Sequence, residues 1–238
     1  MPTVGDSLAE EVSVFAFDTF GTVTDWFSGI RAAVAEEIGD VDAAEFTREW
    51  RRRYSPILAR VESGELEWRG LDDLQAETLG LVATGFGVTL DTGAATRLVR
   101  AWRTIPGWPD AASGLARLRS RFTVCALSNG SVALLSAMAK HNGFGWDVIG
   151  GSDLWRHYKP HPATYLGIAE LLEVTTDQVM MVATHQSDLD AARSVGLHTA
   201  FIERPLEWGD ASLKDDSGSA DNDVHARDIL DLASQLGC

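Results

Sequence analysis

The strongest constraint on the fold is a series of short apolar runs that alternate with segments of helical periodicity. Such runs, bounded by polar residues or glycine, are typical of strands buried on both faces of a parallel sheet. The runs are residues 12–17, 122–127, 147–150, 179–183 and 198–202. Helical patterns that lie between or after the later runs are residues 132–141, 162–172 and 189–195. This alternation predicts an α/β fold with a doubly wound parallel sheet.

A long stretch with helical periodicity separates the first apolar run from the second. Its periodic segments are residues 30–37, 43–61, 72–79 and 92–103. The stretch is too long to be a loop. It predicts a helical cap of residues 24–105 inserted into a core of residues 1–23 and 106–238, with prolines at 106 and 109 marking the return. Near the end of the chain, we expect a surface loop at 214–223 and a final helix at 226–236.

Charge and cysteine usage limit the partners and the compartment. The chain has 20 basic and 35 acidic residues, so its formal charge of -15 would repel nucleic acid and anionic membranes. The two cysteines do not form a disulfide framework, and residues 1–11 have neither a basic nor an apolar region typical of a signal peptide. These features predict a cytoplasmic protein that binds neither nucleic acid nor membrane.

Polar residues follow the apolar runs at the points where the predicted strands end. In a doubly wound sheet the carboxyl ends of the strands meet at one edge, and active sites form there. The four polar groups are Asp18-Thr19-Phe20-Gly21-Thr22, Ser128-Asn129-Gly130-Ser131, Tyr158-Lys159-Pro160 and Thr184-His185-Gln186-Ser187-Asp188.

These groups, in this order and spacing, resemble the motifs of the haloacid dehalogenase (HAD) superfamily. Their details resemble its type II branch, the L-2-haloacid dehalogenases, and the resemblance extends over nearly the whole chain. It implies a HAD-like, Rossmannoid core with an inserted helical cap. It also implies hydrolysis of small 2-haloacids, either L-2-haloalkanoates or haloacetates, through an ester intermediate on Asp18.

Residue types distinguish this branch from the phosphatases of the same superfamily. A phosphatase needs an acid two residues after the nucleophile and acidic ligands for Mg²⁺ in the fourth motif. Here Phe20 stands at the first place, and Ala183 and Thr184 stand where the family pattern has a Gly-Asp pair. A halide leaves as an anion and requires no proton. We therefore expect a reaction that uses neither a metal ion nor another cofactor.

The resemblance assigns catalytic roles to four residues, and His185 is a fifth candidate at a position where the chain departs from the family. Asp18 would be the nucleophile, Thr22 would hydrogen-bond to it, and Lys159 would keep it ionised. Asp188 would pair with Lys159 and orient or activate the hydrolytic water. His185 replaces an asparagine of well-known type II enzymes, and two interpretations stay open for it. It either positions the water or acts as a base near neutral pH, or it fills space and bonds to a backbone carbonyl.

Further residues are candidates for substrate binding. Ser128 and Asn129 would bind the substrate carboxylate at a helix N-terminus, although simple helix capping is an alternative. The resemblance implies that Arg51, with Asn129, receives the halide; a solvated basic helix face is the alternative. Tyr165 would support the lysine or the nucleophile, unless it is a core tyrosine. Candidate walls of a dry pocket are Phe20, Trp50 and Trp68.

Departures from the family pattern leave the substrate range open. Ala183 stands where type II enzymes have serine, which together with His185 suggests a tighter site for haloacetates, with fluoroacetate as an extension. One rival function is hydrolysis of a non-halide bond alpha to a carboxylate. A second is a non-catalytic, ligand-binding protein. The resemblance also suggests a homodimer, for which the sequence indicates no interface.

Overall fold

The computed structural model of the chain describes residues 8, 10–213 and 218–238. Most of the N-terminal segment 1–11, and residues 214–217 of the loop expected at 214–223, lie outside the described residues. Within the described part, no helix has the length and apolar character needed to cross a bilayer.

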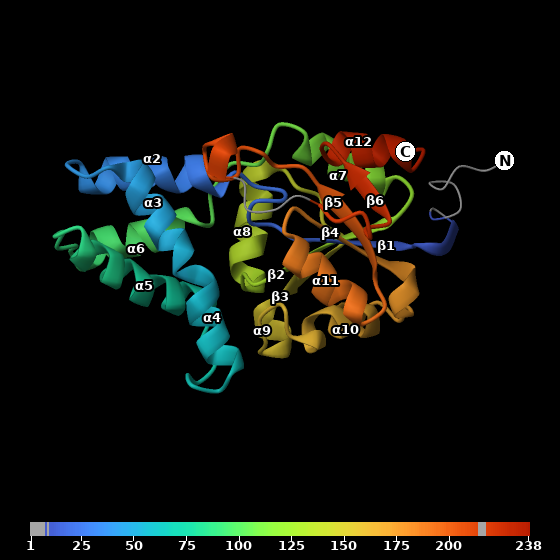
Figure 1. Cartoon of the computed structure of the whole chain (residues 1–238), viewed down its shortest axis with the longest axis horizontal. Coiled ribbons are helices and arrows are strands. Elements are labelled where there is room, and N and C mark those ends of the chain that lie inside the picture. The colour runs from blue at the N-terminus through green and yellow to red at the C-terminus, as the bar shows by residue number, and fades with distance from the viewer. Residues whose placement is uncertain (1–7, 9, 214–217) are drawn as a thin grey trace.

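A six-stranded sheet forms the centre of the molecule, and every neighbouring pair of its strands is parallel. Its order is β3-β2-β1-β4-β5-β6, so that β1 lies between β2 and β4 (Figure 1). The strands are β1 (Val14–Phe17), β2 (Thr123–Ser128), β3 (Val148–Gly151), β4 (Val179–Ala183), β5 (His198–Ile202) and β6 (Val224–Ala226). The five predicted strands and the doubly wound α/β class are confirmed.

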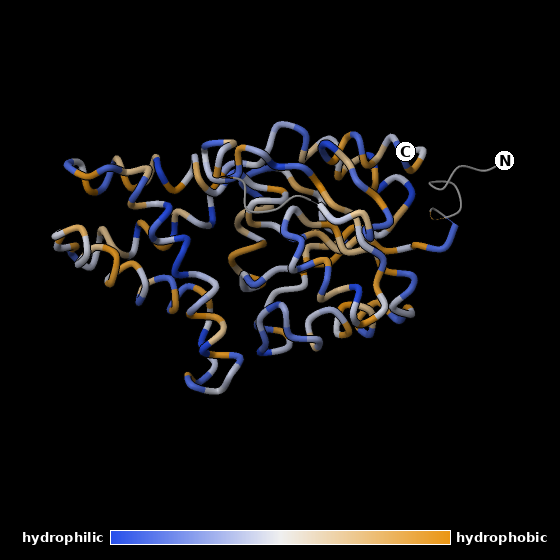
Figure 2. Tube along the Cα trace, viewed as in Figure 1, coloured by the Kyte–Doolittle hydropathy of each residue, from blue (hydrophilic) through white to orange (hydrophobic). Residues whose placement is uncertain are grey.

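Alternate residues of the strands pack into separate cores on the two faces of the sheet. Phe15 and Phe17 of β1 face the core that α7, α8 and α12 cover, whereas Val14 and Ala16 face α10 and α11. The tube in Figure 2 shows apolar residues gathered along the strands. The covering helices are α7 (Ala111–Arg119), α8 (Val132–Asn142), α9 (Ser152–Trp155), α10 (Pro162–Leu171), α11 (Gln186–Ser194) and α12 (Ile229–Gln235), with single turns η1 (Thr176–Gln178) and η2 (Ala211–Leu213).

Two predictions for the core differ from the structure. The helix expected at 226–236 is preceded by the edge strand β6 and begins only at Ile229, after Asp228 caps it by accepting from the Asp231 N–H at 2.7 Å. Three residues are too few to show a strand period, and His225 of β6 is exposed. Helix α7 was not predicted from the sequence.

Five helices between β1 and α7 form a group beside the sheet, which we call the cap helices (Figure 1). They are α2 (Trp26–Ile38), α3 (Ala43–Arg52), α4 (Tyr54–Glu62), α5 (Leu71–Gly85) and α6 (Thr92–Ala101). The periodic segment expected at 43–61 is broken at Arg53 into α3 and α4. Pro56 explains the break, because its ring lacks an N–H and opposes a continuous helix through the preceding turn.

The chain enters and leaves the cap helices at adjacent points. Thr24 and Gly107 form an antiparallel bridge. The Asp25 N–H donates to the Pro106 carbonyl at 2.8 Å, and the Trp108 N–H donates to the carbonyl of residue 23 at 3.0 Å. On this pairing we propose the division expected from the sequence, with a cap of residues 24–105 and a core of residues 1–23 and 106–238.

Candidate active site

The carboxylate of Asp18 lies just beyond the carboxyl end of β1, the strand between β2 and β4. Asp18 is 6% exposed. Lys159 Nζ donates to Asp18 Oδ1 at 2.9 Å, and the Thr22 hydroxyl donates to Asp18 Oδ2 at 2.9 Å. The backbone N–H of Thr184, after β4, fixes the Thr22 hydroxyl at 3.0 Å. Two neighbouring strand ends therefore hold the carboxylate in one orientation.

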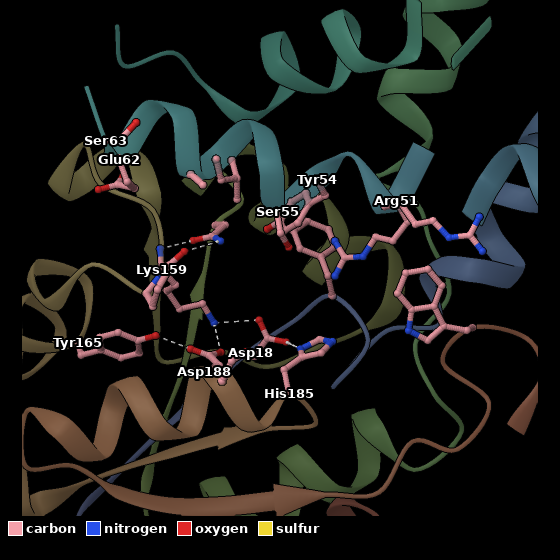
Figure 3. Close-up of a pocket in the computed structure, with 18 of the residues that line it drawn as sticks. Asp18, Arg51, Tyr54, Ser55, Glu62, Ser63, Lys159, Tyr165, His185 and Asp188 are labelled. Carbon is pink, nitrogen blue, oxygen red and sulfur yellow. Dashed lines mark hydrogen bonds and ion pairs between the residues drawn. The ribbon is translucent and has the colours of Figure 1, made fainter. Parts of the chain in front are cut away.

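Lys159 bridges two carboxylates that come from different strand ends (Figure 3). Its Nζ also donates to Asp188 Oδ2 at 2.5 Å, and the Tyr165 hydroxyl donates to Asp188 Oδ1 at 2.6 Å. The side chain of Asn129 accepts from the Lys159 backbone N–H at 2.7 Å. Asn129, Lys159 and Asp188, from three of the predicted strand-end groups, thus lie together with Asp18 in one cavity.

The ionisation of the three charged groups follows from burial and pairing. Burial would raise the pKa of Asp18, but the charge of Lys159 and the contact with His185 outweigh it and hold the pKa below its ordinary value. Burial also opposes the charge on Lys159, yet its two carboxylate partners raise the lysine pKa. Burial raises the pKa of Asp188, and Lys159 offsets this only in part. Asp18 therefore loses its proton at lower pH than Asp188 does.

His185 contacts two carboxylates. Its Nδ1 lies 3.5 Å from Asp18 Oδ2, and its Nε2 lies 2.9 Å from Glu207 Oε1. Burial would lower the pKa of His185, but the charge of Glu207 and the contact with Asp18 raise it well above its ordinary value. The ring does not bond to a backbone carbonyl among the described contacts, which contradicts one of the two interpretations. In its protonated form the ring would donate hydrogen bonds to these carboxylates and would not act as a base.

Glu207 was not predicted from the sequence. It is 5% exposed and also accepts from Trp26 Nε1 at 2.8 Å. Gly21 makes room for it, since a Cβ built on Gly21 would lie 2.3 Å from Glu207 Oε1. The sequence does carry a signal for it, because Glu207 lies in the loop after β5 and the other strand ends carry the site residues.

A cavity of about 1130 Å³ opens above Asp18, between the core and the cap helices. Arg51 of α3 and Tyr54 of α4 reach into it from the cap side (Figure 3). The Arg51 guanidinium lies 4.3 Å from the Tyr54 ring centre and 5.3 Å from the Trp26 ring centre. Its buried Nη1 has no hydrogen-bond partner within the described part of the chain. Other lining residues include Phe20, Asn129, Lys159, Tyr165, His185 and Asp188.

Three residues predicted to bind substrate or to wall the pocket lie elsewhere. Ser128 is buried, and its hydroxyl lies 2.6 Å from that of Thr19. Trp50 packs among the cap helices and donates to the Gln75 carbonyl at 3.2 Å. Successive helix residues point about 100° apart, so Trp50 points away from the cavity when Arg51 faces it. Trp68 stacks on Tyr158 with 6.4 Å between ring centres. None of the three lines the described cavity.

The expected helix-capping alternative for residues 128 and 129 is also resolved. Ser131 caps α8, since its hydroxyl accepts from the Leu134 N–H at 3.1 Å. Asn129 instead faces the cavity and clamps the backbone of Lys159, so it positions the lysine.

The donor set at Asp18 does not fit a Mg²⁺ ion. The place between Asp18 and Asp188 is taken by the Lys159 ammonium, which would repel a second cation. Phe20 and Thr184 offer no carboxylate there.

A second group of possible metal ligands, Glu62, His157 and His161, lies at the cavity edge. The two imidazole rings stack with 3.6 Å between centres and an 8° tilt, so no ion lies in the plane of both. His161 Nδ1 also accepts from the Ala163 N–H at 3.2 Å, a bond that leaves its proton on Nε2. This group is better explained as a hydrogen-bonded contact between cap and core.

Comparisons with known proteins agree with this geometry. The family model of haloacid dehalogenase-like hydrolases matches residues 12–196. The crystal structure of a defluorinating L-2-haloacid dehalogenase is 42% identical, with a TM-score of 0.92, and the match covers 95% of this chain and 96% of that one. The structure of another L-2-haloacid dehalogenase is 39% identical, with a TM-score of 0.90, over 94% of this chain and 99% of that one.

A curated relative supports the same assignment. The (S)-2-haloacid dehalogenase of Xanthobacter autotrophicus is 29% identical over 199 residues, which are 81% of this chain and 76% of the relative. The family predicted from the strand-end motifs is confirmed: this chain belongs to the haloacid dehalogenase-like hydrolases, in the L-2-haloacid dehalogenase branch.

Proposed function

We propose that this protein hydrolyses the carbon–halogen bond of small 2-haloacids, with Asp18 as the nucleophile and without a metal ion. The observation that carries the proposal is the ionised Asp18 carboxylate, which faces a cavity and is held by Lys159 and Thr22. The cavity also contains Arg51, a cation with a buried, unpartnered N–H within the described part of the chain. A nucleophile and an anion acceptor thus share one cavity.

The first step is displacement at C2 of the haloacid. An Asp18 oxygen attacks C2, the carbon–halogen electron pair leaves with the halide, and an ester forms between Asp18 and the acid. In-line attack inverts C2 and sends the halide away from Asp18, toward the cap side. Arg51, assisted by Asn129, stabilises the departing anion there. Phe20 and the Tyr54 ring keep water away from the reacting carbon.

The second step is hydrolysis of the ester. A water attacks the Asp18 carbonyl carbon, and Asp188, held by Lys159 and Tyr165, orients it and takes its proton. The raised pKa of Asp188 makes it a better proton acceptor than an ordinary aspartate. Cleavage releases the 2-hydroxyacid and regenerates Asp18.

The substrate class extends to haloacetates, with fluoroacetate included. The relative that is 42% identical is a defluorinating enzyme, and a 24% identical relative from Moraxella sp. is a haloacetate dehalogenase. Arg51 also supports an anionic substrate, because it lines the cavity with an Nη1 that has no partner among the described residues, whereas Lys159 and His185 are paired with carboxylates. Fluoride is the poorest leaving halide, so its release depends most on the donors at Arg51.

Halide release from L- and D-2-chloropropionate, chloroacetate and fluoroacetate, each with EDTA, tests the proposal. We expect release of halide from the L isomer and from the acetates. In a single turnover in ¹⁸O-water, the label should enter Asp18 and not the product, because water attacks the aspartyl carbon. Halide release that EDTA abolishes would refute the metal-free route. Absence of any halide would favour a non-halide hydrolase or a binding protein.

A further inference from the structure

Glu207 is a buried carboxylate that the reaction described above does not use. It comes from the loop after β5 and is held at 2.8 Å by Trp26 Nε1 of cap helix α2. Its Oε1 also contacts His185 Nε2 at 2.9 Å. Gly21, in the motif that contains Asp18, has no side chain to displace it. Two elements of the core and one cap helix thus converge on this carboxylate.

The contacts of Asp18 differ between its two oxygens. Among the described residues, Oδ1 accepts from Lys159 alone, whereas Oδ2 accepts from Thr22 and lies 3.5 Å from His185 Nδ1. Oδ1 is therefore the oxygen with the freer lone pair, and we take it as the one that attacks C2. Oδ2 then becomes the carbonyl oxygen of the ester, with a hydroxyl and an imidazolium beside it.

We propose that Glu207 is a positioning residue for ester hydrolysis, which holds His185 as a cationic donor so that His185 and Thr22 form an oxyanion site at Asp18 Oδ2. This inference rests on the proposed dehalogenase function. Glu207 matters most after alkylation, since esterification removes the negative charge of Asp18 and leaves Glu207 as the carboxylate that still pairs with the ring. Its charge is the largest of the contributions that raise the pKa of His185.

The electrons and protons of the step balance as follows. The water oxygen bonds to the Asp18 carboxyl carbon, its proton passes to Asp188, and the carbonyl electron pair moves onto Oδ2. Thr22 and His185 donate to that oxyanion. When the pair returns to form the carbonyl, the bond from the carbon to Oδ1 breaks. The proton on Asp188 passes to the departing oxygen, and the 2-hydroxyacid leaves with Oδ1. The second proton of the water stays on the new Asp18 carboxyl group and is then released to solvent, which restores the carboxylate.

The test is the Glu207→Gln variant with chloroacetate, followed by chloride release and by intact-protein mass spectrometry. We expect a stoichiometric burst of chloride, then steady turnover slowed about tenfold or more, because an oxyanion donor is impaired. The ester on Asp18 should accumulate as an added mass. A residue needed only for folding would lower the active fraction without trapping the ester.

The pH dependence gives a second readout. The imidazolium is lost as pH rises through the pKa of His185, so ester hydrolysis should slow on the alkaline side while the chloride burst persists. In Glu207→Gln this limb should move to lower pH. The alkaline limb can be measured in the wild type by itself, so the inference can be tested even if the Glu207→Gln variant does not fold.

Glu203→Gln is the matched control. Glu203 pairs with His225 at 3.3 Å on the surface of the same region and lies outside the cavity. It should retain wild-type turnover and trap no ester. A Glu207→Gln enzyme that turns over normally without trapped ester would overturn the inference and leave the dehalogenase proposal intact. A wild type that releases no halide would instead overturn the dehalogenase proposal itself.

Discussion

Two buried ion-pair networks lie near the carboxyl end of β1, and only one of them lines the described cavity. Arg204 donates to both oxygens of Asp110, at 2.9 and 2.7 Å, and to the Thr22 carbonyl at 2.8 Å. The Ile229 N–H also donates to Asp110 at 2.9 Å. Lys159 instead joins Asp18 to Asp188 at the base of a cavity.

The difference suggests a structural role for the Arg204 network and a chemical role for the Lys159 network. Neither Arg204 nor Asp110 lines the described cavity, so this pair serves to fix Thr22 and the start of α12 relative to the sheet. The Lys159 network is open on the cavity side, where Asp18 Oδ1 accepts from only one group among the described residues. A carboxylate that is oriented and faces a cavity can meet a substrate, whereas one that is enclosed by the protein cannot.

The largest effect is expected for Asp18→Asn. Halide release should fall by about 10⁴-fold or more, because an amide is a poor nucleophile and the ester cannot form. Halide release with each substrate measures this loss, and circular dichroism checks that the variant is folded. Retained turnover would show that another group attacks the substrate, and the comparison of the two networks would fail.

Lys159→Met should reduce halide release by about 10²- to 10³-fold, because Asp18 loses the charge that keeps it ionised. Asp18 has a lowered pKa in the wild type, so its reactive form is lost only as pH falls through that low value. Without the ammonium, the acid limb of the pH–rate profile should move to higher pH. An unchanged acid limb would mean that Lys159 does not control the ionisation of Asp18.

Arg204→Met should act on stability rather than on chemistry. Removing one partner of a buried pair should cost about 3–5 kcal/mol of the free energy of unfolding, measured by urea titration at neutral pH. The pKa of Asp110 is lowered by Arg204 against the effect of burial, so this contribution disappears as pH falls through the folded-state value. A variant as stable as the wild type at neutral pH would contradict the structural role.

The smallest effect is expected for Trp50→Phe. Trp50 and Arg51 are neighbours on α3, but only Arg51 lines the described cavity, so this variant tests whether a residue outside the cavity affects stability alone. The substitution removes the hydrogen bonds to Gln75 and Thr78 and should cost about 1 kcal/mol of stability. The kcat and KM of the folded enzyme should change little, because Trp50 faces the interior of the cap. A large rise in KM would place Trp50 in the substrate cavity after all.

Strand ends were predictable because a parallel sheet brings them to one edge whatever the intervening sequence. Asp18, Lys159 and Asp188 meet for this reason, although 141 residues separate the first two. The resemblance to a known family then supplied their chemistry. Thr22 contacts Asp18, as the resemblance implied, whereas Tyr165 donates to Asp188 rather than to the lysine or the nucleophile.

Two kinds of feature were not predictable in the same way: the direction of a side chain, which depends on how its helix is rotated about its axis, and the position of a residue in a distant loop. The direction of Trp50 is set by how α3 turns against α5, which periodicity alone does not fix. Glu207 lies in an irregular loop, and its approach depends on the missing side chain of Gly21. The alternation of buried and exposed residues in β6 covers only three residues, which is too short to distinguish a strand from the start of a helix.

The paired crossings at Thr24 and Gly107 have a consequence for how such a protein can diversify. Because the two crossings are hydrogen-bonded to each other, the two ends of the inserted segment are held together where they join the core. The entropy of closing such a loop grows only with the logarithm of its length. Insertions, deletions or substitutions in the segment between these two crossings therefore change the core's stability little. Substrate preference can evolve in the inserted segment while the residues that carry out the chemistry stay in place.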